Sequence, residues 1–119
     1  MTTVRPELNL TVNLSAYMAE ARNRPLPPAV DREAKHRILD SLAAIVSGST
    51  LKPGQMALQY VRSLGGTPES MLMTTNDVSS AANAAMANGM LGHSDETDDF
   101  DPASKAHPGC SVIPAAWAM

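Results

Sequence analysis

The residues best suited to chemistry lie close together, between His93 and His107. Five of the chain's twelve acidic residues fall within seven positions here, and two of its three histidines flank them. Neighbouring imidazoles and carboxylates can hold a proton on one group and accept a proton on another. The segment therefore favours acid–base chemistry. The candidate catalytic residues are Glu96, Asp98, Asp99 and His107.

The segment ends in His107-Pro108-Gly109-Cys110-Ser111, which has the pattern of a helix start. Free backbone amides at a helix start attract anions. A substrate carboxylate could bind there, within reach of His107. Lys105 is the only cation nearby. The candidate substrate-binding residues are His93, Lys105 and Ser111.

Three other uses of this segment compete with catalysis. An acidic run between helices is often a solvated surface loop, and the chain would then be a non-catalytic helical interaction module. An EF-hand is excluded, because Phe100 occupies the turn position that needs glycine and Ala106 occupies the position of the bidentate Glu. A divalent-metal site of His93, His107 and an Asp lacks tight ligand spacing, so we predict no metal.

Cys110 adds a further candidate group at the same helix start. It could be a nucleophile activated by the helix terminus and His107. A lone cysteine in such a place is more often a small packed residue. Because it is the only cysteine, no internal disulfide can form, which fits a reducing cytosol.

Five helices are predicted to position these residues, so the expected fold class is all-α. Apolar residues recur at three- and four-residue spacing from Val30 to Ile45, and Gly48 ends that helix. Ser70–Thr74 could be an edge strand or an extended linker. The expected helices span about residues 13–22, 28–47, 53–64, 77–91 and 109–119, with Asn13 or Ser15 capping the first and Asp77 or Ser79 capping the fourth.

Composition narrows the class of protein. Hydrophobic residues make up 44% of the chain and aromatic residues 3%, which favours closely packed helices over sheets. A net charge of −3 provides no basic surface for nucleic acid, and the few aromatics provide no stacking platform. There is no signal-peptide pattern and no apolar run of the ~18 residues that span a membrane. We expect a soluble, cytoplasmic protein that does not enter membranes.

The last residues predict a helix that has only begun. Pro114 suits a first helical turn, and no stop signal follows it before Met119. We therefore expect residues 1–119 to be part of a longer enzyme, with the rest of its site elsewhere.

Several stretches of the chain resemble the MmgE/PrpD family, which includes 2-methylcitrate dehydratase and cis-aconitate decarboxylase. The resemblance covers roughly residues 12–119. The matching stretches are Ala82–His93, Asp98-Asp99, His107-Pro108, Ile38–Leu42 and Val46–Gly48.

The resemblance implies a fold and an activity. Family members have a large all-helical domain and a smaller α/β domain in chains several times longer, usually as homodimers without metal or organic cofactor. Residues 1–119 would then be a partial N-terminal helical domain, and the isolated fragment would be inactive. The implied activity is that of a lyase on a small di- or tricarboxylic acid such as a 2-methylcitrate-like substrate. Dehydration is the first expectation, with decarboxylation or epimerisation as alternatives.

The loop departs from the family pattern of His, two residues, Asp, an aromatic, Asp-Asp-Thr and a later His-Pro. Glu96 stands where the first Asp is expected, and Thr97 where the aromatic would be. Phe100 replaces the usual Thr, and the segment to His107 is one residue longer. The resemblance implies His107 as the leading acid or base, Glu96 and Asp98 as its partners, and Asp99 as an orienting residue.

Overall fold

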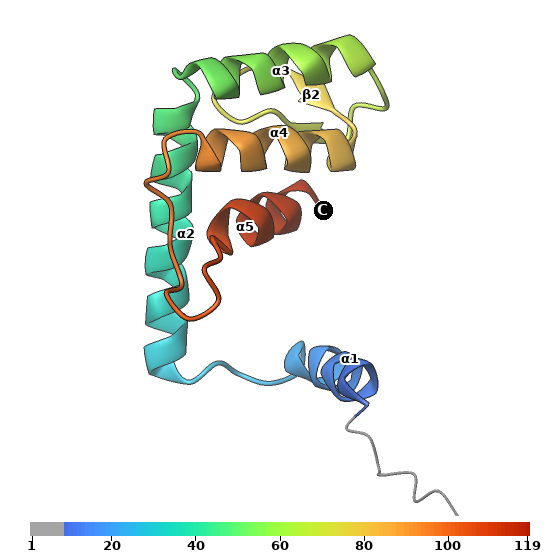
Figure 1. Cartoon of the computed structure of the whole chain (residues 1–119). Helices are drawn as coiled ribbons and strands as arrows, with labels where there is room; N and C mark the ends of the chain where they lie inside the picture. Colours follow the sequence, from blue (N-terminus) through green and yellow to red (C-terminus); the bar gives the residue numbers. More distant parts are fainter. Residues whose placement is uncertain (1–8) are drawn as a thin grey trace, which may run out of the picture. The chain divides into compact units, whose positions relative to one another are not determined.

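The computed structural model describes residues 9–119, which contain five helices and one two-stranded sheet (Figure 1). The mostly helical architecture expected from the sequence is confirmed. None of the described helices is both long and apolar enough to cross a membrane. The elements are α1 (Leu10–Ala21), α2 (Pro28–Gly48), α3 (Lys52–Leu64), β1 (Ser70–Met71), β2 (Val78–Ser79), α4 (Ala81–His93) and α5 (Gly109–Ala118).

The chain divides after Asp31 into two compact units, which are described separately. The first contains α1 and the first turn of α2. Asn9 caps α1, because its side-chain oxygen accepts a hydrogen bond from the Val12 N–H at 3.2 Å. The expected caps Asn13 and Ser15 are wrong, since both residues lie inside the helix.

In the second unit α4 packs between α3 and α5 (Figure 1), and the buried cluster lies between α4, α2, α3 and the residues that follow β1. Ala84 and Ala87 are completely buried, and their small side chains let neighbouring helices approach closely. In the apolar stripe expected on α2, Ile45 is buried, Leu42 is partly buried and Ile38 is exposed. The buried cluster consists of Ile45, Leu58, Val61, Leu72, Met73, Ala84, Ala87 and Leu91.

Glycines set the distance between α4 and its neighbours. A Cβ atom at Gly48 would lie 1.9 Å from the Leu91 carbonyl oxygen, so α2 and α4 meet backbone to backbone. A Cβ atom at Gly89 would lie 2.7 Å from the Cys110 carbonyl oxygen, where α4 meets α5. These approaches bring the end of α4, where His93 lies, next to the start of α5.

A short hairpin connects α3 to α4. Ser70 pairs with Ser79 and Met71 with Val78 in antiparallel register. The expectation of a strand near Ser70 is therefore correct for two residues, but the partner strand was not predicted. Ser79 lies in this strand instead of capping α4, and Asp77 precedes the strand. Ser80 is the cap, with its hydroxyl oxygen accepting from the Asn83 N–H at 3.4 Å.

Asn88 anchors the hairpin to α4 from within the core. Its side chain is fully buried. Its Oδ1 accepts a hydrogen bond from the Met73 N–H at 2.8 Å, and its Nδ2 donates to the Met71 carbonyl at 3.1 Å. Both polar ends of the amide are thus satisfied, as a buried polar side chain requires.

We predict that Gly48→Ala destabilises the fold, because the added methyl group meets the Leu91 carbonyl oxygen. Overpacking of this kind costs about 1–3 kcal/mol. The matched control is Gly92→Ala, whose Cβ atom would lie 3.4 Å from the nearest atom, a side-chain carbon of Ile45. The measurement is the free energy of unfolding in urea, and equal values for the two variants would contradict the close approach of α2 and α4.

Candidate active site

The loop between α4 and α5 folds back on itself. The Asp101 N–H donates to the Ala106 carbonyl at 2.9 Å, and the Lys105 N–H donates to the Asp101 carbonyl at 2.8 Å. The Ser104 hydroxyl and N–H both donate to the Asp101 carboxylate, and the hydroxyl bond is the main reason that the pKa of this carboxyl is lowered. This closed turn precedes His107 and returns the chain towards the end of α4.

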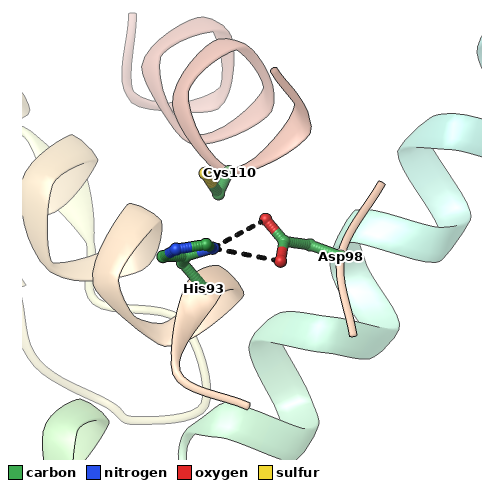
Figure 2. Close-up of side chains that lie close together, drawn as sticks. All are labelled: His93, Asp98 and Cys110. Atoms are coloured by element: carbon green, nitrogen blue, oxygen red, sulfur yellow. Dashed lines mark hydrogen bonds and ion pairs between the residues drawn. The ribbon is translucent and has the colours of Figure 1, made fainter. Parts of the chain in front are cut away.

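Asp98 is the centre of the site. Its side chain is 1% exposed, whereas that of His93 is 45% exposed. His93 Nδ1 lies 3.1 Å from Asp98 Oδ1 and 3.2 Å from Oδ2, so the ring faces the whole carboxylate (Figure 2). A buried carboxylate needs such partners to offset the loss of water around its charge.

His107 approaches the same carboxylate. Its Nδ1 lies 3.2 Å from Asp98 Oδ1, which is ion-pair distance, but the angles are not those of a hydrogen bond. The Nδ1 atom is buried and has no hydrogen-bond partner among the described residues. The His107 ring lies 4.8 Å from the His93 ring and 5.2 Å from the Phe100 ring, centroid to centroid. Two imidazoles therefore share one carboxylate.

Asp99 has a different position from Asp98, although the two are adjacent in sequence. Its Oδ1 accepts a hydrogen bond from the Gly109 N–H at 2.8 Å, at the start of α5. A Cβ atom at residue 109 would lie 2.5 Å from this oxygen and 2.6 Å from Ser41 Oγ, so glycine leaves the room for this contact. The amide that was expected to hold a substrate carboxylate is thus bound to a carboxylate of the protein itself.

Asp95 and Glu96 lie in the turn that follows α4. The Ser47 hydroxyl donates to the Asp95 carboxylate and ties the loop to α2. Together with hydrogen bonds from Thr97, this contact lowers the pKa of the Asp95 carboxyl. Glu96 is exposed, has a φ of 55°, and its side chain makes no hydrogen bond or ion pair within residues 9–119. The structure thus brings Asp98, His93 and His107 together and leaves Glu96 outside this group.

Lys105 and Ser111 lie near different members of the site. Lys105 Nζ lies 5.7 Å from the centroid of the Phe100 ring, which in turn contacts His107. Ser111 is exposed and, with His93 and Cys110, lines an open pocket of about 380 Å³ between α4 and α5. The rest of the pocket lining is mainly apolar: Ala85, Met86, Gly89 and Met90.

Cys110 Sγ points into the same region from the start of α5 (Figure 2). It donates a hydrogen bond to the His107 carbonyl at 3.1 Å. Burial raises the pKa of the Cys110 thiol, and the Asp98 carboxylate raises it further. The thiol therefore stays protonated at neutral pH, which weakens its candidacy as a nucleophile.

The tertiary contacts that shape the site come from residues that the sequence did not single out. Ser47 lies 48 positions before Asp95, and Ser41 lies far from Gly109 along the chain. Phe100 was noted only as a departure from a motif. A serine on a helix has no sequence signature that distinguishes a surface hydroxyl from one that holds a distant loop.

Comparison with known proteins now places the chain in a family. The family model of the MmgE/PrpD N-terminal domain matches residues 12–119. A cis-aconitate decarboxylase-like protein, oryM, from Aspergillus oryzae is 26% identical over 113 residues, which are 95% of this chain and 23% of that protein. The chain thus spans about a quarter of the length of this relative. It belongs to the MmgE/PrpD family.

Proposed function

We propose that this chain carries the proton-transfer residues of a cofactor-independent lyase that dehydrates a small di- or tricarboxylic acid. The observation that carries the proposal is the buried Asp98 carboxylate, which lies 3.1–3.2 Å from Nδ1 of both His93 and His107. A carboxylate at Nδ1 orients an imidazole and leaves its Nε2 for the substrate, as in catalytic triads. Membership of the MmgE/PrpD family supports enzymatic function.

In this mechanism, His107 is the leading acid or base and Asp98 holds its ring. A base removes a proton from the carbon next to a substrate carboxylate, and an acid protonates the leaving hydroxyl group. Two imidazoles on one carboxylate suit these two roles, because one ring can accept a proton as the base and the other can donate a proton as the acid. His93, the more exposed of the two, is proposed to contact the substrate.

The remaining candidates take supporting roles in the proposal. Asp99 orients the site by holding the start of α5 through the Gly109 N–H. Glu96 is proposed as a partner in proton transfer. Its exposed side chain places it at the edge of the site. Lys105 and Ser111 are proposed to contact substrate carboxylates or hydroxyls.

We further propose that residues 1–119 are the N-terminal helical part of a longer enzyme that acts as a homodimer. A polycarboxylate needs several cationic partners, and Lys105 is the only Lys or Arg between His93 and Ser111. The other cations would come from the remainder of the enzyme. Decarboxylation is the second candidate reaction, because the Aspergillus relative is named as a decarboxylase-like protein.

We predict that Asp98→Asn in the full-length enzyme lowers kcat by about 10²–10⁴-fold, because the imidazoles lose the charge that orients them. The matched variant is Glu96→Gln, which also neutralises one carboxylate of the loop but at an exposed position. A smaller loss is expected for it. The measurements are steady-state turnover of candidate di- and tricarboxylates and exchange of substrate carbon-bound hydrogen with deuterated water. Equal losses of kcat in the two variants would show that Asp98 is not the carboxylate on which proton transfer depends.

We also predict that His107→Gln lowers kcat by about 10²–10⁴-fold with a much smaller change in KM and an intact fold. The control is His36→Gln on α2, because His36 is exposed and pairs with Glu33 on the same helix, at 3.8 Å. This control should keep both parameters near those of the unaltered enzyme. If His107→Gln retains more than about half of kcat, its imidazole is not the transfer group. The segment is then better described as a solvated acidic loop of an interaction module.

A further inference from the structure

Phe100 is a residue of the loop to which the proposed function gives no role. Its side chain is 50% exposed, although it is large and apolar. The centroid of its ring lies 5.2 Å from that of the His107 ring and 5.7 Å from Lys105 Nζ. An exposed aromatic ring thus contacts both the proposed acid or base and the one cation of the loop.

The backbone of the closed turn produces this arrangement. Asp101 and Ala106 form an antiparallel bridge, so Phe100 and His107, which flank the bridge, lie opposite each other. Lys105 has a φ of 60°, in the left-handed region that residues with a side chain rarely adopt. Its N–H donates to the Asp101 carbonyl at 2.8 Å, which keeps the turn closed. An unfavourable backbone conformation of this kind is typical of functional sites.

The Lys105 ammonium is available for a ligand in spite of the acidic residues around it. Within residues 9–119 it makes no ion pair with a carboxylate, and its contact is the Phe100 ring. The nearby Asp101 carboxylate is instead occupied by the hydroxyl and the N–H of Ser104. A polycarboxylate that enters the site therefore meets a cation that the protein has not neutralised.

We propose that Phe100 is a positioning residue that holds the Lys105 ammonium beside His107, where this ammonium binds one carboxylate of the substrate. The face of an aromatic ring is negative and attracts a cation within about 6 Å of its centroid. A lysine side chain has many rotamers, so a ring that holds its end reduces the entropy lost when the carboxylate binds.

This inference rests on the proposed function for the class of substrate, and it adds how that substrate is oriented. A carboxylate bound to Lys105 brings the carbon next to it towards His107. In the proposed reaction that carbon loses the proton. Phe100 thus contributes to the choice of the carboxylate that lies beside the reacting carbon.

Substitutions of Phe100 in the full-length enzyme test the role of the ring. Phe100→Leu keeps an apolar side chain without an aromatic face. We expect it to raise KM for the di- or tricarboxylate substrate about 2–5-fold, the factor that corresponds to an exposed cation–π contact, and to leave kcat nearly unchanged. Phe100→Trp provides a better face for a cation, so KM should stay at or below that of the unaltered enzyme.

The matched control is Tyr60→Leu, which removes another half-exposed aromatic ring, on α3 outside the loop. It should change neither KM nor kcat. Circular dichroism checks that each variant keeps its helices. Should Phe100→Leu fail to fold, the Phe100→Trp result still decides, because an increased KM in that variant contradicts the proposal.

Binding of succinate separates this inference from the proposed reaction. Succinate has two carboxylates and no hydroxyl group to lose, so calorimetry on the full-length enzyme measures binding without turnover. We expect Phe100→Leu to weaken succinate binding about 2–5-fold when Lys105 is present. In a Lys105→Met background the same substitution should cause no further loss, because the ring then has no ammonium to hold.

Three results would overturn the proposal. The first is that succinate does not bind to the unaltered enzyme. The second is that Phe100→Leu binds succinate as tightly as the unaltered enzyme does. The third is an equal loss of affinity with and without Lys105, which would show that Phe100 does not act through that residue. If the expected binding is found but no di- or tricarboxylate is turned over, the proposed reaction is wrong and the carboxylate site stands.

Discussion

The burial of one carboxylate governs the arrangement of this molecule between α4 and α5. Asp98 is 1% exposed, and a carboxylate removed from water is stable only beside groups that compensate its charge. His93 and His107 provide that compensation from opposite ends of the loop. The hydrogen-bonded turn between Asp101 and Ala106 reverses the chain. His107 can therefore reach the Asp98 carboxylate, as His93 does.

Close helix packing makes this arrangement available. Backbone contact at Gly48 places the end of α4 against α2, and backbone contact at Gly89 places α4 against the start of α5. Side chains at these positions would separate the helices and move His93 and Cys110 apart. Asp99 fixes the start of α5, because its carboxylate accepts a hydrogen bond from the Gly109 N–H. The site thus depends on small residues that carry no chemistry of their own.

The same group of side chains carries the proposed function. A buried carboxylate shared by two imidazoles suits proton transfer, since it orients the rings and leaves their outer nitrogens free. Cys110 lies within 4.8 Å of His93 and Asp98, but burial and the Asp98 carboxylate raise the pKa of its thiol, which therefore stays protonated beside them.

The sequence alone determined the helices and the family, because apolar spacing, prolines and glycines act locally and the loop motif is contiguous. It predicted α2 almost to the residue and the start of α5 at Gly109, but it began α4 too early and missed the cap at Asn9 and the strand at Val78–Ser79. It also named the right loop for the candidate site. Only the tertiary structure separated Asp98 from Asp99 and Glu96, three acids that look alike in sequence. Their difference arises from burial and from partners that the fold delivers, and neither is encoded by spacing along the chain.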